Sequence, residues 1–147
     1  MKRQIEITPE AHPRAYKAMM ALEAYLAQVS ISGKIKDLIK IRASYLNGCS
    51  YCVDMHTKEA MNRGETLQRI LLIPAWKEAA KFFTEAEQVV LNMTEEITLV
   101  HQRGLSDATY ENANRFFNET EIAEIIMTIV TINAWNRIAI STHTQIE

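Results

Sequence analysis

The stretch "DLIKIRASYLNGCSYCVDMHTKEAMNRGE", residues 37–65, contains two helical patterns separated by a break. Apolar residues recur at helical spacing in its first part, and "NG" at Asn47–Gly48 then provides a stop signal. A new helix is expected to begin within the CxxC that follows and to run to about Asn62, where Gly64 ends it. The stretch therefore predicts two consecutive helices.

Helical periodicity continues through the rest of the chain, and no stretch alternates convincingly as a strand would. The first expected helix runs from Pro13 to about Val29, with the apolar stripe Ala15, Met19, Leu22, Leu26 and Val29. The second is capped by Ser32 and has the stripe Ile35, Leu38, Ile39 and Leu46. After the CxxC helix we expect a short helix near Thr66 to Leu72, one from the Thr84/Glu87 capping box to about His101, one opened by Ser106 or Asp107 and running through "ATYENANRFF", and one from the Asn118/Glu121 capping box to about Thr142. We predict an all-α fold of about six to eight helices, in one domain spanning residues 1–147.

The composition is ordinary for a globular protein, with 147 residues, 48% hydrophobic and 23% charged residues and a formal net charge of −2. This length is sufficient for one domain with a hydrophobic core. The Lys and Arg residues form no basic tract, and the net charge is slightly negative. The sequence therefore has no electrostatic footprint for nucleic acid.

Neither an export signal nor a membrane span is expected. The start "MKRQIEITPE" lacks the apolar core of a signal peptide, and the most apolar run, "IAEIIMTIVTINAW", is interrupted by polar residues. That run is also shorter than the roughly 20 residues that a membrane helix needs. A cytoplasmic location is the default expectation, and two nearby cysteines there indicate redox or metal chemistry more than a structural disulfide.

The two cysteines of the chain, Cys49 and Cys52, are three residues apart, and His56 follows four residues after the second. Because a helix advances by about 100° per residue, these side chains share one face if the helix includes Cys49. The free N–H groups and the dipole of a first helical turn favour a reactive thiolate. His56 can accept the proton of Cys52 or, as imidazolium, stabilise its thiolate. The second thiol can then resolve an oxidised first one by forming a disulfide.

Two other interpretations are open at this point. The cysteines could be small buried residues without chemistry, or they could bind zinc together with His56 and a fourth ligand from elsewhere. The other histidines, His12, His101 and His143, are distant in sequence and form no ligand-like cluster. We therefore rank redox chemistry above metal binding.

These residues together resemble a known family. The stretch from Asp37 to Glu65 is similar to the central motif of the AhpD-like alkylhydroperoxidases, within the carboxymuconolactone decarboxylase superfamily. "PAWKEA" and "INAWNRIAI" are similar to other parts of the same family, so the resemblance covers roughly residues 15–142. The motif is specific because NGC, CxxC and the following histidine occur together with an acidic residue upstream.

The resemblance implies an all-helical subunit that assembles into trimers or hexamers, and thiol peroxidase chemistry without haem, flavin or metal. It implies a proton relay that combines the two cysteines and His56 with an acid twelve residues before Cys49. That acid is Asp37, where the family has glutamate, and Tyr51 replaces a histidine just before the second cysteine. The shorter aspartate would need a bridging water or a closer helix to reach His56.

We therefore expect a thiol-dependent peroxidase of the alkylhydroperoxidase type in antioxidant defence, with Cys52 attacking and Cys49 resolving. The opposite assignment is also open, since Cys49 is expected closer to the helix end and to solvent. Expected partners are a peroxide, a dithiol reductant or adaptor protein, and further copies of the chain, because the final helix is apolar around most of its circumference. No cofactor, nucleic acid or membrane partner is expected. The alternatives are a non-enzymatic helical oligomer that senses redox state and a carboxymuconolactone decarboxylase-like enzyme.

Overall fold

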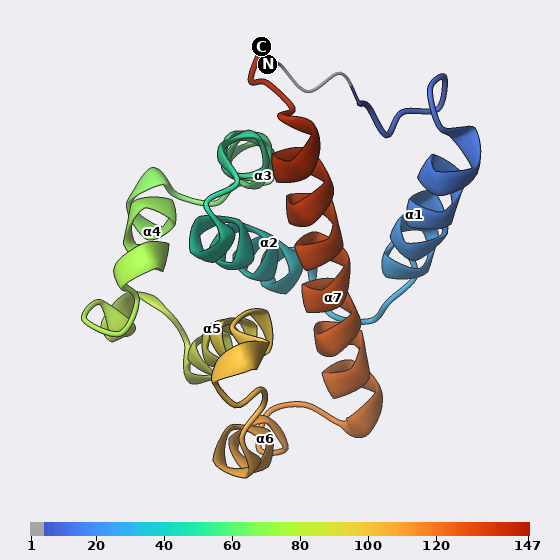
Figure 1. Cartoon of the computed structure of the whole chain (residues 1–147). Helices are drawn as coiled ribbons and strands as arrows, with labels where there is room; N and C mark the ends of the chain where they lie inside the picture. Colours follow the sequence, from blue (N-terminus) through green and yellow to red (C-terminus); the bar gives the residue numbers. More distant parts are fainter. Residues whose placement is uncertain (1–4) are drawn as a thin grey trace.

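The computed structural model describes residues 5–147, and all regular structure in that range is helical (Figure 1). The seven α-helices are α1 (Pro13–Leu26), α2 (Gly33–Asn47), α3 (Ser50–Asn62), α4 (Leu67–Leu72), α5 (Glu85–Thr98), α6 (Asp107–Ala113) and α7 (Glu119–Thr142). Short 3₁₀ helices are η1 (Ile73–Ala75), η2 (Ala80–Phe82) and η3 (Val100–Gln102). The predicted all-α fold class is confirmed. The first four residues, part of the stretch considered as an export signal, lie outside the described residues.

The helix α2 is central, because it packs against α3, α5 and α7. Its apolar side chains Leu38, Ile39, Ile41 and Ala43 are no more than 1% exposed. The stripe expected from the sequence contained only the first two of these. Neighbouring helices cover α2 on more than one side, so residues outside a single stripe are buried as well.

The helix α7 runs through the middle of the molecule, with α1 on one side and α2 and α3 on the other (Figure 1). Its isoleucines Ile122, Ile125, Ile129 and Ile132 are at most 3% exposed and form part of the main core, together with residues of α2 and α5. Val130 of the same helix, however, is 44% exposed. In the described part of the chain, no helix is both long and apolar enough to cross a bilayer.

The predicted helix starts are confirmed by their capping hydrogen bonds. Five N-cap side chains each accept a hydrogen bond from a backbone N–H in the first turn of their helix: Ser32, Thr66, Thr84, Ser106 and Asn118. Thr84 and Asn118 also form complete capping boxes. Three helix ends differ from the prediction. The first helix ends at Leu26 instead of about Val29, and α6 ends at Ala113, before the predicted "NRFF". The helix α5 ends at Thr98 instead of about His101, after which the chain tightens into the 3₁₀ helix η3.

Candidate active site

The turn between α2 and α3 places Cys49 at the start of α3. Gly48 ends α2 in the left-handed conformation, with φ 67° and ψ 31°, which glycine adopts without a steric penalty. The N–H groups of this residue and the next donate to the carbonyl oxygens of Tyr45 and Ser44, at 3.1 and 3.0 Å. Cys49 is then the N-cap residue of α3, and its carbonyl accepts the first helical hydrogen bond, from Val53 at 2.9 Å.

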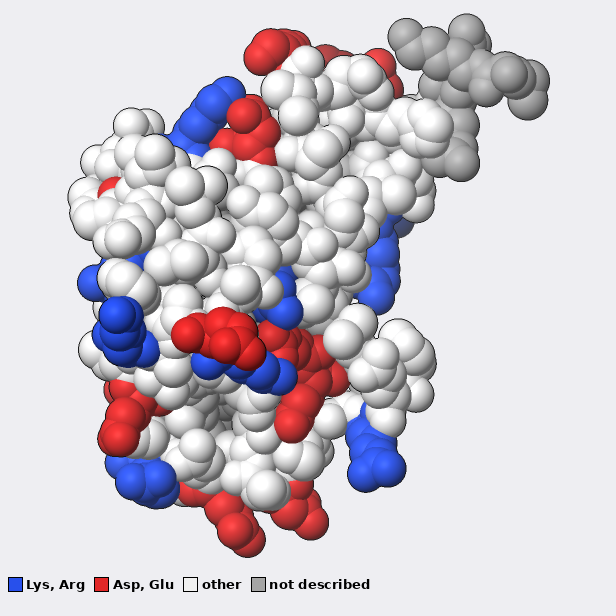
Figure 2. All heavy atoms as spheres, turned by 90° about the vertical axis from the view of Figure 1, so that its left-hand side faces the viewer, with Lys and Arg blue, Asp and Glu red and all other residues white. Residues whose placement is uncertain are grey.

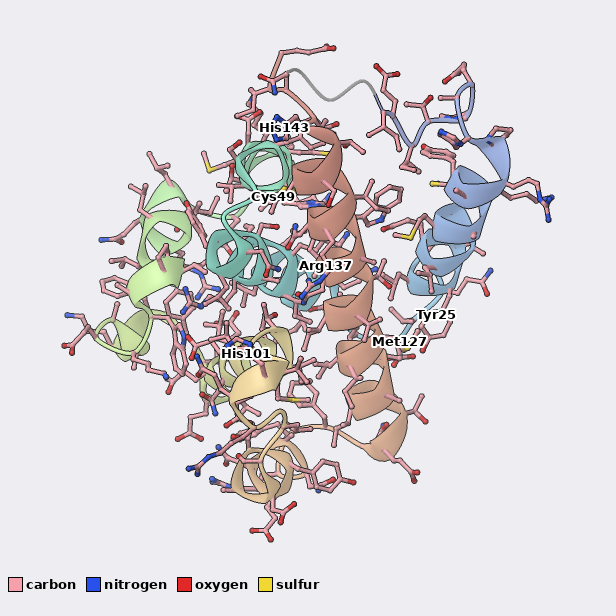
Figure 3. All side chains as sticks on the ribbon, viewed as in Figure 1. Tyr25, Cys49, His101, Met127, Arg137 and His143 are labelled. Carbon is pink, nitrogen blue, oxygen red and sulfur yellow. A yellow bond between two sulfur atoms is a disulfide. The ribbon has the colours of Figure 1, made fainter. Side chains whose placement is uncertain are left out.

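Cys49 and Cys52 are joined by a disulfide, with their Cα atoms 5.3 Å apart. The pair lies where α2 and α3 meet, beside α7, as the labelled Cys49 shows in Figure 3. Ala139 of α7 and the half-buried Tyr51 pack against it. Each cysteine is only 2% exposed, so Cys49 is not more accessible to solvent than Cys52.

His56 lies on α3 four residues after Cys52 and is 7% exposed. Its Nδ1 lies 3.0 Å from Oε2 of Glu59, which is one turn further along the same helix. Burial lowers the pKa of His56 below the ordinary value of 6.5, and the positive charge of Lys40 adds to this effect. The hydrogen bond and charge of Glu59, together with the charge of Glu23, oppose it.

Asp37 is buried on α2 and pairs with Arg63, the residue that ends α3. Nε of Arg63 lies 2.9 Å from Oδ2 of Asp37, and its Nη2 is hydrogen-bonded to Oδ1. The same Nη2 lies 3.9 Å from Oε2 of Glu59. The carboxylate partner of His56 is therefore Glu59, not Asp37 as considered from the sequence. The guanidinium of Arg63 lies between Asp37 and Glu59 and connects the two.

Sequence reasoning missed Glu59 and Arg63 as neighbours of the candidate site. The signal was present, because residues three and four apart on a helix lie next to each other. Glu59 follows His56 by three residues and precedes Arg63 by four. The pairing of Asp37 with Arg63 joins two helices and could not be inferred from spacing within either one.

A partly buried network of amides lies at the last turn of α2. Nδ2 of Asn47 donates to Oδ1 of Asn133 and to Oδ1 of Asn136, at 3.0 and 2.9 Å. Asn136 is fully buried and donates to Oγ of Ser44 at 3.1 Å. The network links α7 to the last turn of α2, directly before the cysteines.

Other features of residues 5–147 lie apart from the two cysteines and His56. On the face shown in Figure 2, basic and acidic side chains alternate in small groups. Two open cavities, of about 240 and 430 Å³, share Trp76 and Lys77 in their linings, and neither lining includes a cysteine or His56. Within residues 5–147, no group of three or more His, Cys, Asp or Glu side chains is arranged to hold a metal ion.

Known proteins resemble this chain in sequence and in fold. The sequence model of the carboxymuconolactone decarboxylase family matches residues 13–96. The uncharacterised protein YdfG of Bacillus subtilis (strain 168) is 39% identical over 132 residues, which cover 90% of this chain and 89% of YdfG. A crystal structure of an Agrobacterium tumefaciens protein of unknown function, whose name proposes the antioxidant defence protein AhpD, matches with a TM-score of 0.92. Its identity is 37%, over 98% of this chain and 99% of that chain. The debrominase Bmp8 matches with a TM-score of 0.81 at 20% identity, over 92% of this chain and 72% of Bmp8, which shows a shared fold.

Proposed function

The chain belongs to the carboxymuconolactone decarboxylase family, and from that premise we propose that it is an AhpD-like, thiol-dependent peroxidase. The observation that carries the proposal is the joined pair Cys49 and Cys52 at the N-terminus of α3, with His56 one turn after the second sulfur. The name of the Agrobacterium relative, which is similar over almost its whole length, supports a role in antioxidant defence.

The reaction begins when His56 accepts the thiol proton of Cys52. The thiolate attacks the O–O bond of a peroxide, an S–O bond forms, and the departing alkoxide takes up the proton held by His56. The products are an alcohol and a sulfenic acid on Cys52. The thiol of Cys49 then displaces the hydroxyl group as water, which forms the disulfide. A cellular dithiol, acting directly or through an adaptor protein, supplies two electrons and two protons and restores both thiols.

We assign Asp37 an indirect part in this proton relay. Its carboxylate holds Arg63, whose guanidinium in turn approaches Glu59, the hydrogen-bond partner of His56. Asp37 therefore acts through two intervening side chains. This arrangement suits the short side chain of aspartate, because Asp37 does not need to reach the imidazole itself.

Burial of the two sulfurs favours a second candidate, a helical oligomer that senses redox state. Since each cysteine is 2% exposed, a peroxide or a dithiol reaches the sulfurs only after side chains such as Tyr51 move. Slow access would suit a protein that is oxidised once and then changes its binding or assembly. The two candidates differ in turnover, because a sensor consumes one peroxide per disulfide formed.

Steady-state peroxide reduction with a dihydrolipoamide-type donor tests the proposal. We expect repeated turnover by the wild type and background rates for Cys52→Ser. An exposed site such as Asn114→Ala provides a control for handling and purity. A single stoichiometric oxidation without turnover would favour the sensor, and equal rates for wild type and Cys52→Ser would contradict the assigned chemistry.

We also propose that the chain forms a homo-oligomer, a trimer or a hexamer, with one domain per chain. The apolar stripe of α1 is covered only in part, since Leu26 is buried but Ala15 is exposed. Tyr25 of α1 and Val130 of α7 are 42% and 44% exposed. Figure 3 labels Tyr25 and Met127 on these two helices, which pack against each other. Light scattering at micromolar concentration should show the assembly, and a monomer there would contradict it.

A further inference from the structure

We propose that Glu59 is the positioning residue of His56, holding a proton on Nδ1 and leaving Nε2 free to accept the proton of a thiol. The inference rests on the proposed function, because it names the group that prepares His56 for that chemistry. It differs from the relay that the family resemblance implies, in which Asp37 reaches His56 through a bridging water or a closer helix. Glu59 acts through the imidazole and needs no contact with peroxide or sulfur.

The hydrogen bond between His56 and Glu59 fixes the tautomer of the ring. Oε2 of Glu59 lies 3.0 Å from Nδ1, within ordinary hydrogen-bond distance. An ionised carboxylate can only accept hydrogen bonds, so the proton of this bond has to reside on Nδ1. In the neutral ring, Nε2 is then the unprotonated nitrogen and serves as the acceptor.

Asp37 is committed to another partner. Both of its carboxylate oxygens accept hydrogen bonds from Arg63, and its side chain is 6% exposed. The guanidinium is thereby held in place, and its Nη2 lies 3.9 Å from Oε2 of Glu59. A fixed positive charge beside Glu59 favours the orientation in which this carboxylate faces His56. Asp37 thus affects the orientation of the Glu59 carboxylate through Arg63.

Other charged groups approach His56 from the helices packed around it. Lys40 of α2 lowers the pKa of the ring, in the same direction as burial, and Glu23 of α1 raises it. Glu23 is already an acceptor for Nε1 of Trp135, at 3.0 Å. Among these charged groups of the described chain, Glu59 is the one hydrogen-bonded to the ring. Removing its charge should therefore change both the tautomer and the pKa of His56.

The direct test is nitrogen-detected NMR of the His56 ring as a function of pH in the full-length oxidised protein. In the wild type, the neutral ring should carry its proton on Nδ1. In Glu59→Gln, the preference should weaken and the pKa of His56 should fall. Asp54→Asn is the matched control, since it removes a carboxylate of α3 that pairs with Lys58, at 2.7 Å, instead of His56. It should titrate as the wild type does.

The second readout is the pH profile of iodoacetamide reaction in the reduced protein. A His56 that is a poorer base should slow thiol alkylation near neutral pH by about two- to fivefold in Glu59→Gln, with partial recovery in Glu59→Asp. Wild-type tautomer and pKa in Glu59→Gln would overturn the inference, as would equal losses in Glu59→Gln and Asp54→Asn. Absence of peroxide turnover in the wild type would instead count against the proposed function, because the NMR result does not depend on turnover.

Discussion

The N-terminal end of α3 is held by backbone hydrogen bonds and apolar packing, whereas its later turns combine the apolar packing of Ala60 with pairs of charged side chains. Around Cys49, the supports are the left-handed Gly48, two backbone N–H bonds and the contact with Ala139. Around His56, they are a carboxylate and a guanidinium that are both about half exposed. The sulfurs are thus placed by the fold itself, while the His56 ring is oriented by side-chain pairs that can change without altering the fold.

The largest effect is expected from breaking the amide network at the last turn of α2. Asn136→Ala removes the amide that links Asn47 and Ser44 and leaves their polar groups without this partner. The free energy of unfolding should fall by about 2–3 kcal/mol, measured by urea denaturation. Asn114→Ala, an exposed amide that donates to its own helix, is the control and should change stability by less than about 0.5 kcal/mol. A similar small change in Asn136→Ala would show that the amide network does not stabilise this end.

Gly48→Ala tests the backbone geometry of the same end. The positive φ of this residue should make alanine destabilising by about 1–2 kcal/mol, although no atom lies within 4 Å of the added Cβ. Gly33→Ala is the matched control, because Gly33 opens a helix, has no positive φ and is also unobstructed. That change should be neutral or stabilising by up to about 1 kcal/mol. Thermal melting of both variants measures the difference, and equal effects would remove the conformational explanation.

Asp37 provides a test of the charged end. Asp37→Asn should lower the free energy of unfolding by about 1 kcal/mol, since Arg63 is half exposed and loses an ionised partner. Because the proposed influence of Asp37 on His56 passes through Arg63 and Glu59, the pH profile of iodoacetamide reaction should shift less than in Glu59→Gln. Asp37→Glu keeps the charge and should leave that profile unchanged. A profile that moves more in Asp37→Asn than in Glu59→Gln would contradict the indirect role.

The smallest effect concerns the pH dependence of stability. Burial lowers the pKa of His56 in the folded protein, so below pH 6.5 the unfolded chain binds a proton more readily than the folded one. The contribution of the neutral ring to stability is complete above pH 6.5 and decreases as the pH falls through the folded pKa. The urea midpoint between pH 7.5 and 5 should therefore decline more in the wild type than in His56→Gln. Parallel curves would show that His56 is not buried as described.

Local features of this chain could be predicted from its sequence, and long-range ones could not. The stop at Gly48, the start of α3 within the CxxC and the Thr84 and Asn118 capping boxes each depend on residues within a few positions of one another. The spacing of Cys49 and Cys52 likewise predicted a disulfide, and the structure contains it.

The partners of Asp37 and Asn47 lie beyond any such local pattern. Arg63 is 26 residues from Asp37, and Asn136 is 89 residues from Asn47. A charged or amide side chain offers several equivalent hydrogen-bonding choices, and the packing of distant helices decides among them. This is why the CxxC and His56 were identified as candidates from the sequence, whereas the partners of Asp37 and Asn47 were not. Glu59 was missed although its spacing from His56 is local.

The short separation of the two cysteines has a consequence for the oxidised and reduced forms of the whole chain. A disulfide stabilises a fold chiefly by restricting the unfolded chain, and the restriction grows with the length of the loop that it closes. Cys49 and Cys52 are three residues apart, so the bond closes almost the smallest loop that a chain can form. By chain entropy such a loop contributes about 2 kcal/mol, less than a longer loop would. The melting temperature of the disulfide form should therefore exceed that of the dithiol form by only several degrees. In the proposed cycle, the folding equilibrium would therefore change only modestly each time the chain passes between dithiol and disulfide.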